Sequence, residues 1–331
     1  MELHQLGAAG PRVFALGLGC MGMSGMYGAS DRAQCIATIR AALDAGVDLL
    51  DTGDFYGMGH NELLIQEALR ERPRDEVSIS VKFGALRDPA GGWGGYDARP
   101  EAIKNFVAYS LTRLGVDYID IYRPARLDPQ VPIEETVGAI ARLVEEGYVR
   151  HIGLSEVGVE TLRRAASVHP ISDLQIEYSL ISRGIETRIL PACRALGIGI
   201  SAYGVLSRGL ISGHWHAGAA DGGDFRAHSP RFQGEALEHN LALVETLRQL
   251  AEGCGLTPAQ LAIAWVAAQG SDIVALVGAR RLDRLSEALG AVDARLDHAT
   301  LEALDTAFPP GIAVGDRYAP AQMAMLDSER D

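Results

Sequence analysis

The sequence predicts an α/β protein of the (β/α)8 barrel class, and three observations support this prediction. A short apolar strand, a loop and an amphipathic helix recur along the 331 residues. Several strands are nearly continuous apolar runs, as expected for parallel strands that are covered on both faces. Glycine accounts for 38 residues, and many of these glycines stand beside the apolar runs, where tight turns between strands and helices need them.

The expected elements follow one another in a regular order. A hairpin is expected first, from residues 3–6 and 12–14. The eight barrel strands are expected at residues 15–19, 48–51, 77–82, 118–122, 151–154, 173–176, 199–202 and 273–277. Helices fit between them at residues 31–45, 61–70, 100–114, 133–146, 159–168 and 185–196, and as a pair within 235–269. Candidate boundary residues are one N-cap, two first-turn prolines and four C-terminal glycines: Ser30; Pro100 and Pro132; Gly46, Gly115, Gly147 and Gly197.

No linker or change in composition divides the chain, so residues 1–331 are expected to form a single barrel domain. Two glycine-rich loops are long for a compact barrel, namely 84–99 with Trp93 and 212–234 with Trp215. Loops of this length are often lids or binding loops. In this class of barrel the chemistry takes place at the C-terminal ends of the strands, so we expect the functional residues there.

Composition and charge exclude several classes of function. The chain carries 30 Lys and Arg against 43 Asp and Glu, a net charge of −13, so it lacks the basic surface expected for nucleic acid or anionic membranes. No stretch approaches the roughly 18 apolar residues of a membrane span, and no signal-peptide pattern is present. Four scattered cysteines favour free thiols in a reducing cytosol. We expect a cytoplasmic protein, and its oligomeric state stays open, a homo-oligomer included.

Gly17, Gly19 and Gly22 match the G-x-G-x-x-G pattern directly after a predicted strand. This pattern is the dinucleotide fingerprint of a doubly wound fold, where it opens a helix at once. Here residues 23–28 intervene before the first helix, and no acidic residue ends a second strand about 20 residues further on. The pattern is better explained as a glycine-rich loop after the first barrel strand.

An acid, a phenol and an amine stand at the ends of two neighbouring strands, as Asp51, Tyr56 and Lys82. A free phenol titrates near pKa 10, and a buried ammonium beside it lowers that pKa. A carboxylate paired with the lysine would hold the ammonium charged and oriented. Tyr56 is therefore a candidate proton donor to a carbonyl oxygen. The simpler alternative is a buried Asp51–Lys82 ion pair beside a tyrosine that only packs in its loop.

Several ordered segments resemble the aldo-keto reductase superfamily over nearly the whole chain, namely 51–57, 81–84, 148–155, 175–179, 202–206 and 278–281. Within that superfamily the sequence is most similar to bacterial reductases of the pyridoxal-reductase type. The resemblance implies a (β/α)8 barrel that binds NADPH (NADP+) without a Rossmann domain. It also implies hydride transfer between the nicotinamide and an aldehyde or ketone, or the corresponding alcohol.

The resemblance assigns roles to individual residues. Tyr56 matches the general acid, Lys82 the partner that lowers its pKa, and Asp51 the counter-ion of the lysine. For the nicotinamide end of the cofactor, the matching positions are Ser155 and Gln175 at the carboxamide and Tyr203 for stacking on the ring. For the phosphates they are Leu206, Arg208 and Arg226, and for the adenosine phosphate Arg280, Arg284 and Glu287. Further cofactor positions beside these are Met21, Gly204, Gly278 and His214. Guanidinium groups suit a 2′-phosphate, which favours NADPH over NADH, although a solvated helix face is the alternative for these arginines.

The chain departs from the family at the end of the fourth strand, where a catalytic histidine is usual. Ala125 stands there and cannot donate a hydrogen bond to a substrate oxygen. Either Tyr56 and Lys82 act alone, or Arg123 points into the barrel by strand alternation and supplies the missing electrostatic help. Another alternative is an NADPH-binding regulatory or scaffold protein with little turnover. A Schiff-base enzyme is disfavoured because a lysine paired with Asp51 stays protonated.

Two smaller departures concern the cofactor site. Glu156 stands where asparagine is common, which puts one carboxamide contact in question, and His214 stands where lysine is frequent. His214 and His216 have metal-like spacing, but no third ligand is evident, so no metal is expected. The substrate is expected to be a small carbonyl compound or alcohol. Its contacts, assigned by analogy to the barrel mouth, are Tyr27, Trp93, Arg123 and the C-terminal segment near Arg317 and Tyr318.

Overall fold

The computed structural model describes residues 3–216 and 224–330. Within these residues, eight parallel strands close into a barrel in the spatial order β10, β11, β12, β3, β4, β5, β8 and β9. The strands are β3 (Leu16–Gly19), β4 (Leu49–Gly53), β5 (Ser78–Phe83), β8 (Ile119–Pro124), β9 (Val149–Ser155), β10 (Ile171–Glu177), β11 (Gly199–Tyr203) and β12 (Ile273–Gly278). All eight barrel strands expected from the sequence are present. The (β/α)8 prediction is confirmed, and the doubly wound alternative is excluded.

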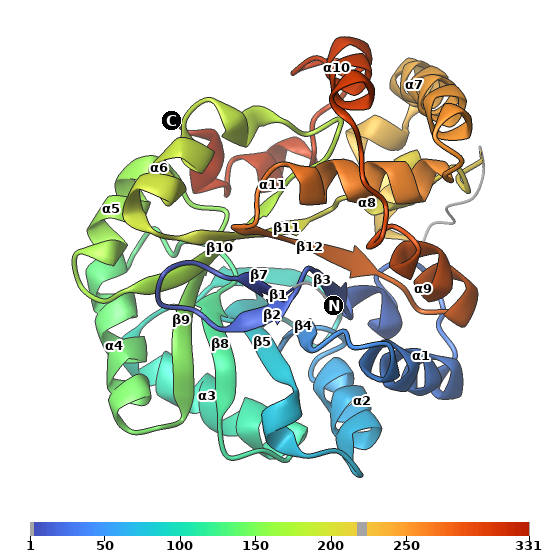
Figure 1. Ribbon diagram of the computed structural model, residues 1–331. Coiled ribbons are helices and arrows are strands. Elements are labelled where there is room, and N and C mark those ends of the chain that lie inside the picture. The colour runs from blue at the N-terminus through green and yellow to red at the C-terminus, as the bar shows by residue number, and fades with distance from the viewer. Residues whose placement is uncertain (1–2, 217–223, 331) are drawn as a thin grey trace.

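Helices surround the barrel and connect one strand to the next (Figure 1). The helices expected from the sequence are α1 (Arg32–Asp44), α2 (His60–Leu69), α3 (Pro100–Leu114), α4 (Ile133–Glu145), α5 (Val159–Ala166), α6 (Ile189–Leu196), α7 (Gly234–Gly253) and α8 (Pro258–Ala268). Helices not expected from the sequence follow the last barrel strand: α9 (Leu282–Leu289), α10 (His298–Ala307) and α11 (Pro320–Met323). Helix α6 begins later than residue 185 because a separate 3-10 turn precedes it.

Two of the candidate boundary residues do not have the expected role. Asp31, rather than Ser30, caps α1, since the Asp31 carboxylate accepts a backbone N–H of the first turn at 2.7 Å. The Ser30 hydroxyl instead donates to a carbonyl of the preceding loop. Pro100 opens α3 as expected, whereas Pro132 stands one position earlier, at the N-cap of α4. The four glycines expected after helices all have positive φ angles, as left-handed helix ends require.

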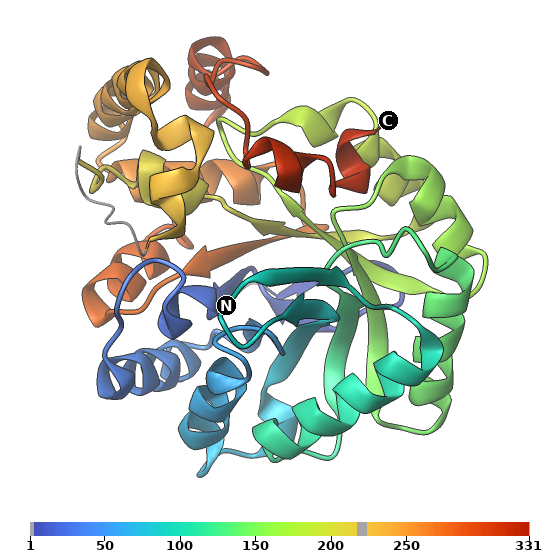
Figure 2. The same ribbon diagram turned by 180° about the vertical axis from the view of Figure 1, so that it is seen from behind.

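The N-terminal hairpin covers the end of the barrel at which the strands begin. Strand β1 (Leu3–Gln5) pairs antiparallel with β2 (Arg12–Phe14), as expected. Leu6 at the turn of this hairpin packs against Leu49 and Val274, which point inward from β4 and β12. Figure 1 shows the hairpin in blue at the near end of the barrel, and Figure 2 shows the opposite end, where the longer loops gather. The hairpin therefore leaves only that opposite end for a ligand.

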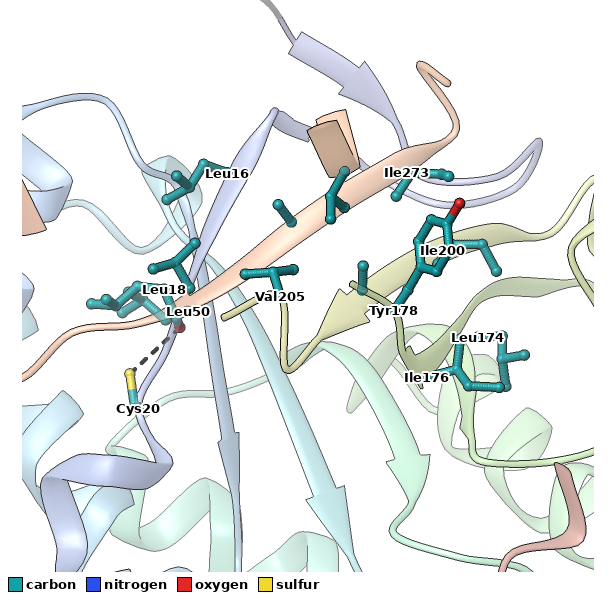
Figure 3. Packing of buried hydrophobic residues seen from close by; sticks show 14 of the residues in the cluster. Leu16, Leu18, Cys20, Leu50, Leu174, Ile176, Tyr178, Ile200, Val205 and Ile273 are labelled. Carbon is teal, nitrogen blue, oxygen red and sulfur yellow. Dashed lines mark hydrogen bonds between the residues drawn. The ribbon is translucent and has the colours of Figure 1, made fainter. Parts of the chain in front are cut away.

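Side chains alternate between the two faces of the barrel strands. In β10, Leu174 and Ile176 belong to the apolar cluster between the sheet and the helices, together with Ile200 of β11, as Figure 3 shows. The intervening Asp173 and Gln175 form hydrogen bonds inside the barrel. This period of two places apolar side chains in the outer core and polar ones in the barrel interior. At the C-terminal ends of the strands these polar residues come together.

The first long loop, 84–99, contains a hairpin that the sequence did not predict. Strand β6 (Ala85–Arg87) pairs antiparallel with β7 (Trp93–Tyr96). Gly84 opens the hairpin with a φ of 87°, and a Cβ there would lie 2.7 Å from the Asp97 carbonyl oxygen. Only glycine fits this approach, so the turn fixes where the hairpin begins.

The second long loop, 212–234, lies partly outside the described residues. Its described part contains two short 3-10 turns, Phe225–His228 and Pro230–Phe232. Tyr27, from the segment after β3, forms an isolated bridge with Asp224 and so joins the two segments at the barrel mouth. In the described parts of the chain, no helix has both the length and the apolar character needed to cross a membrane.

Candidate active site

A cavity of about 910 Å³ lies at the C-terminal ends of the barrel strands. The hairpin β6–β7 and the C-terminal segment lie on this face of the molecule (Figure 2). Residues predicted from the sequence to catalyse or to bind cofactor line it throughout: Asp51, Tyr56, Lys82, Met21, Ser155, Gln175, Tyr203, Gly204, Leu206, Arg208, His214, Arg226, Gly278, Arg280, Arg284 and Glu287. Tyr27 and Trp93, predicted to contact substrate, line it as well.

Asp51 and Lys82 form a buried ion pair at the floor of the cavity. The register of β4 and β5 brings their ends together, and the Lys82 ammonium lies 2.5 Å from Asp51 Oδ1. The other carboxylate oxygen accepts hydrogen bonds from the Ser80 hydroxyl at 2.9 Å and the Gln175 amide at 2.7 Å. Burial lowers the pKa of Lys82, and the Asp51 carboxylate opposes this change. The pair is therefore held in place by hydrogen bonds from Ser80 of β5 and from Gln175 of a further strand, β10.

Tyr56 lies in the turn after β4, with its ring beside this ion pair. The Lys82 ammonium is 5.1 Å from the centre of the Tyr56 ring, and Phe55 packs against that ring edge-on at 4.8 Å. Burial raises the pKa of Tyr56 well above its ordinary value, the Asp51 charge adds to the rise, and the Arg126 guanidinium opposes it. The pKa of Tyr56 is thus raised, and not lowered as expected from the sequence, because burial dominates. Tyr56 keeps its proton at neutral pH, which is the form a proton donor needs.

The prediction that Arg123 contacts substrate is wrong. Its side chain points into the barrel, as strand alternation indicated, but it lies below the cavity and is fully buried. The Arg123 guanidinium pairs with the Asp173 carboxylate at 2.7 Å and donates to the Ser80 hydroxyl at 3.1 Å. Inward residues of a barrel form stacked layers, and only the last layer meets a ligand at the mouth. Arg123 belongs to an inner layer and supports the barrel interior.

Ala125 and Arg126 follow the end of β8 and both line the cavity. The methyl group of Ala125 offers no hydrogen-bond donor to the cavity. Arg126 donates to the Ala125 carbonyl at 2.6 Å, and to the hydroxyls of Ser155 and Tyr318 at 3.4 Å each. Arg126 could not be predicted from strand alternation, because alternation along β8 no longer applies beyond the last strand residue, Pro124.

Ser155, Gln175 and Tyr203 form one polar and aromatic wall of the cavity. They come from the ends of β9, β10 and β11, which the strand register places side by side. The Ser155 hydroxyl and the Gln175 amide are buried except where they meet the cavity. The Tyr203 hydroxyl lies 2.8 Å from that of Tyr318. This wall offers hydrogen bonds to an amide group and an aromatic ring for stacking.

Glu156, next to Ser155, does not serve as a carboxamide contact, because its carboxylate is fully engaged elsewhere. It receives two hydrogen bonds from the Arg317 guanidinium, at 3.0 and 2.9 Å, and one from the Ser328 hydroxyl at 2.6 Å. The Tyr203 hydroxyl donates to it at 2.6 Å. Burial alone would raise the pKa of Glu156, but Arg317, with smaller contributions from Arg126 and Ser328, outweighs burial and holds it far below its ordinary value. The sequence shows the unusual glutamate but gives no sign of its partner, which lies 161 residues away.

Two arginines assigned to phosphate binding are already paired with carboxylates. Arg208 lies 3.1 Å from Glu177, which also contacts Arg317 at 3.4 Å. Burial alone would raise the pKa of Glu177, but Arg208 and Arg317 together keep it below its ordinary value. Arg226 forms an ion pair with Asp224 at 2.5 Å. A phosphate at this part of the cavity would meet guanidinium groups whose charge is largely balanced.

The far end of the cavity carries a cluster of polar side chains from α9 and its neighbours. His214 lies 2.7 Å from the Glu287 carboxylate, and Arg284 contacts the same oxygen at 3.3 Å. Arg280 donates to two backbone carbonyls of the segment after β3, at 3.1 Å each, and has no carboxylate partner among the described residues. The parts of the chain that are described contain no group of three His, Cys, Asp or Glu able to hold a metal ion.

Comparison with known proteins gives similar sequences and structures over nearly the whole chain. The glycerol dehydrogenase of Gluconobacter oxydans has a TM-score of 0.85 and 29% identity, over 96% of this chain and 98% of that one. An aldo-keto reductase of Klebsiella pneumoniae in complex with NADPH has a TM-score of 0.74 and 27% identity, over 94% and 96% of the two chains. The holo form of an aldo-keto reductase from Bacillus halodurans has a TM-score of 0.78 and 26% identity, over 93% and 96%.

The sequence comparisons agree with the structural ones. "Probable aldo-keto reductase 1" of Glycine max is 42% identical over 318 residues, which cover 95% of this chain and 91% of that protein. The model of the Aldo/keto reductase family matches residues 15–308, from the first barrel strand to the end of α10. With this match over most of its length and a closed (β/α)8 barrel, the chain belongs to the aldo-keto reductase family.

Proposed function

We propose that this protein is an NADPH-dependent oxidoreductase that transfers a hydride between the nicotinamide and an aldehyde or ketone, or the corresponding alcohol. One observation carries the proposal: the buried Asp51–Lys82 pair lies beside the ring of Tyr56 at the wall of the 910 Å³ cavity. Membership of the aldo-keto reductase family supports it. So does the likeness to a reductase solved with NADPH.

The residues around the cavity fit NADPH. At one end, Arg280 presents a guanidinium group that has no carboxylate partner among the described residues, which suits a 2′-phosphate. At the other end, Ser155 and Gln175 offer a hydroxyl and an amide for a carboxamide, and Tyr203 offers a ring for stacking. The volume of about 910 Å³ lies near the upper end of ordinary ligand sites, as an elongated dinucleotide with a small substrate requires.

In the direction of reduction, bound NADPH supplies the hydride that reaches the carbonyl carbon. Tyr56 donates its phenolic proton to the carbonyl oxygen, so that the substrate gains one hydride and one proton and becomes the alcohol. The ammonium of Lys82 stabilises the phenolate left on Tyr56, and Asp51 keeps that ammonium in place. Tyr56 then recovers a proton from solvent. In alcohol oxidation the same groups act in reverse, with Tyr56 as the base.

Ala125 favours a second candidate function. Ala125 lines the cavity with a methyl group and gives no hydrogen bond to the substrate oxygen, at a position where the sequence resemblance leads us to expect a histidine. A protein that binds NADPH but turns over little, and that acts in regulation or as a scaffold, would tolerate this loss. The two candidates differ in turnover and agree in NADPH binding.

Two measurements on the full-length protein separate the candidates. Trp93 and Trp215 line the cavity, so NADPH should quench their fluorescence on binding. Oxidation of NADPH with a panel of aldehydes and ketones, and reduction of NADP+ with alcohols, measures turnover in both directions. Binding with turnover supports the oxidoreductase. Binding without turnover of any compound favours the regulatory candidate, and no binding at all contradicts both.

We also propose a cytoplasmic location. The four cysteines of the chain are free thiols. Cys20, Cys35 and Cys193 are buried, and Cys254 is exposed. Unpaired thiols persist in a reducing compartment, whereas an oxidising one favours disulfides. Fractionation of cells with an antibody to the native protein would test this, and recovery from an oxidising compartment would contradict it.

A further inference from the structure

Arg126 is a cationic side chain inside the cavity that forms no ion pair with a carboxylate in the described part of the chain. The charge of Glu156 acts on it, but that carboxylate is already paired with Arg317. The three hydrogen bonds of Arg126 go to neutral oxygens, on Ala125, Ser155 and Tyr318. No carboxylate in the described ranges, 3–216 and 224–330, forms an ion pair with it. Nη1 uses both of its N–H groups in these bonds and Nη2 uses one, so Nε–H and one Nη2–H are left. A guanidinium group with two unused N–H donors can bind an oxyanion through more than one hydrogen bond.

Most other cationic side chains that line the cavity are paired with a carboxylate, unlike Arg126. Five cationic side chains that line the cavity are each paired with a carboxylate in the described residues. These pairs are Lys82 with Asp51 at 2.5 Å, Arg208 with Glu177 at 3.1 Å, Arg226 with Asp224 at 2.5 Å, Arg281 with Asp283 at 2.6 Å and Arg284 with Glu287 at 3.3 Å. Arg126 and Arg280 alone among the lysine and arginines that line the cavity are unpaired in that part of the chain. A cation shielded from bulk water is costly unless an anion balances it.

The two unpaired arginines lie at opposite ends of the cavity. Arg280 stands at the end where we propose that the adenosine phosphate binds. Arg126 stands at the catalytic end, beside Ala125 and within 3.4 Å of the Ser155 hydroxyl. Its charge acts on both Tyr56 and Lys82, so it is close to the reacting groups. An anion bound by Arg126 would therefore belong to the substrate rather than to the phosphates of the cofactor.

We propose that the substrate carries an acidic group, a carboxylate or a phosphate, and that Arg126 binds it. This inference rests on the proposed function and names the substrate class of the same site. Between Arg126 and Tyr56 the cavity wall is largely aromatic, with Phe55 packed on Trp93 at 5.9 Å and Tyr96 beside them. The substrate class is therefore an aldehyde or ketone whose carbonyl group and acidic group are joined by a short, apolar or aromatic spacer.

The first test needs no variant and compares charged and neutral carbonyl compounds of nearly equal shape. With NADPH, 4-carboxybenzaldehyde should have a kcat/KM about 30-fold higher than its methyl ester, because the pair with the guanidinium is lost in the ester. Glyceraldehyde 3-phosphate against glyceraldehyde gives the same comparison for a phosphate. A preference in one pair only identifies the acid, whereas equal rates in both pairs overturn the inference.

The second test assigns the preference to Arg126. Arg126→Met should bring the ratio of acid to ester close to 1, and Arg126→Lys should keep part of it, since an ammonium binds an anion without the bidentate geometry. Arg280→Met is the matched control, because it removes the other unpaired guanidinium. It should raise the KM for NADPH and keep the ratio of acid to ester. Melting curves show whether each variant is folded, and the lysine variant carries the test if the methionine variant is not.

The possible outcomes show separately whether the acidic substrate class is wrong and whether the proposed oxidoreductase function is wrong. If no carbonyl compound is reduced, acid or ester, the proposed function itself fails. If esters are reduced as well as acids, the oxidoreductase stands and the acidic substrate class is wrong. If Arg126→Met raises the KM for NADPH while the preference for acid persists, Arg126 serves the cofactor, and the inference is overturned.

Discussion

Glu156 at the end of β9 and Arg317 in the C-terminal segment form a buried ion pair with two hydrogen bonds, at 3.0 and 2.9 Å. Glu156 has a φ of 52°, in the left-handed region that costs free energy for residues other than glycine. The pair compensates for this strain. Because Tyr318 and Met325 follow Arg317 along the chain and line the cavity, the pair also holds one wall of the active site in place.

Replacing Glu156 with glutamine should destabilise the protein and loosen that wall. The variant keeps the shape of the side chain and leaves Arg317 without its main anionic partner, which costs about 3 kcal/mol of unfolding free energy. The KM for the carbonyl substrate should rise as Tyr318 loses its position. Chemical denaturation at pH 7 and steady-state kinetics measure the two effects. Glu160→Gln, at an exposed position of α5, is the control and should change stability by less than about 0.5 kcal/mol.

The pH dependence of this effect has a definite sign. The pKa of Glu156 is lowered on folding from an ordinary value of 4.5. A carboxylate of this kind contributes its full stability above the unfolded pKa and loses it as the pH falls toward the folded value. The difference between wild type and Glu156→Gln should therefore be constant from pH 5 to pH 8 and shrink below about pH 4. A difference that grows toward acid pH would contradict the ion pair.

Asp54 should destabilise the protein at alkaline pH. Burial and the nearby charge of Glu62 raise the pKa of Asp54 from 3.8 to about 7. The folded state therefore favours the protonated carboxyl, and stability falls as the pH rises from about 4 through 7. Asp54→Asn should remove this loss and gain about 1–2 kcal/mol at pH 8, since partial exposure reduces the full penalty. Denaturation at pH 5 and pH 8 measures it, and exposed Asp75→Asn should show no such gain.

Ala125→His tests whether the missing imidazole limits turnover. The new donor would stand at the end of β8, on the wall of the cavity near Tyr56, and hydrogen bonds that form in the transition state raise kcat. We expect an increase of about 10-fold in kcat for the carbonyl compounds that wild type reduces. Ala125→Phe fills the same space without a donor and should lower kcat. Unchanged kcat for every compound with Ala125→His would show that this position does not limit the reaction.

The barrel and most of its site could be predicted from the sequence because both depend on local pattern. The eight strands are short apolar runs bounded by turn residues, and Asp51 and Lys82 end two of them, so barrel geometry alone brings them together. The hairpin β6–β7 escaped prediction because its segment is rich in glycine and lacks alternating apolar residues. It is held instead by contacts such as the Arg87 guanidinium over the Trp93 ring at 4.3 Å.

The sequence could not predict how deep a side chain lies in the barrel, or which residues far apart in the sequence form ion pairs. Strand alternation correctly predicts that Arg123 points into the barrel. The sequence around Arg123 does not show that its guanidinium pairs with the Asp173 carboxylate at 2.7 Å, which keeps Arg123 below the cavity. Arg126 reaches the cavity only because the chain leaves the strand after Pro124. The pair of Glu156 with Arg317 depends on how the C-terminal segment returns across the barrel mouth. These relations are tertiary, so single-sequence patterns do not encode them.

The central claim is that Tyr56 is the proton donor in an NADPH-dependent reaction, and Tyr56→Phe tests it most directly. The variant removes one hydroxyl and keeps the ring that packs on Phe55 at 4.8 Å. We expect kcat for carbonyl reduction to fall by about 100-fold or more, while NADPH still quenches tryptophan fluorescence with a Kd within about threefold of that of wild type. Full activity in Tyr56→Phe would show that Tyr56 is not the proton donor.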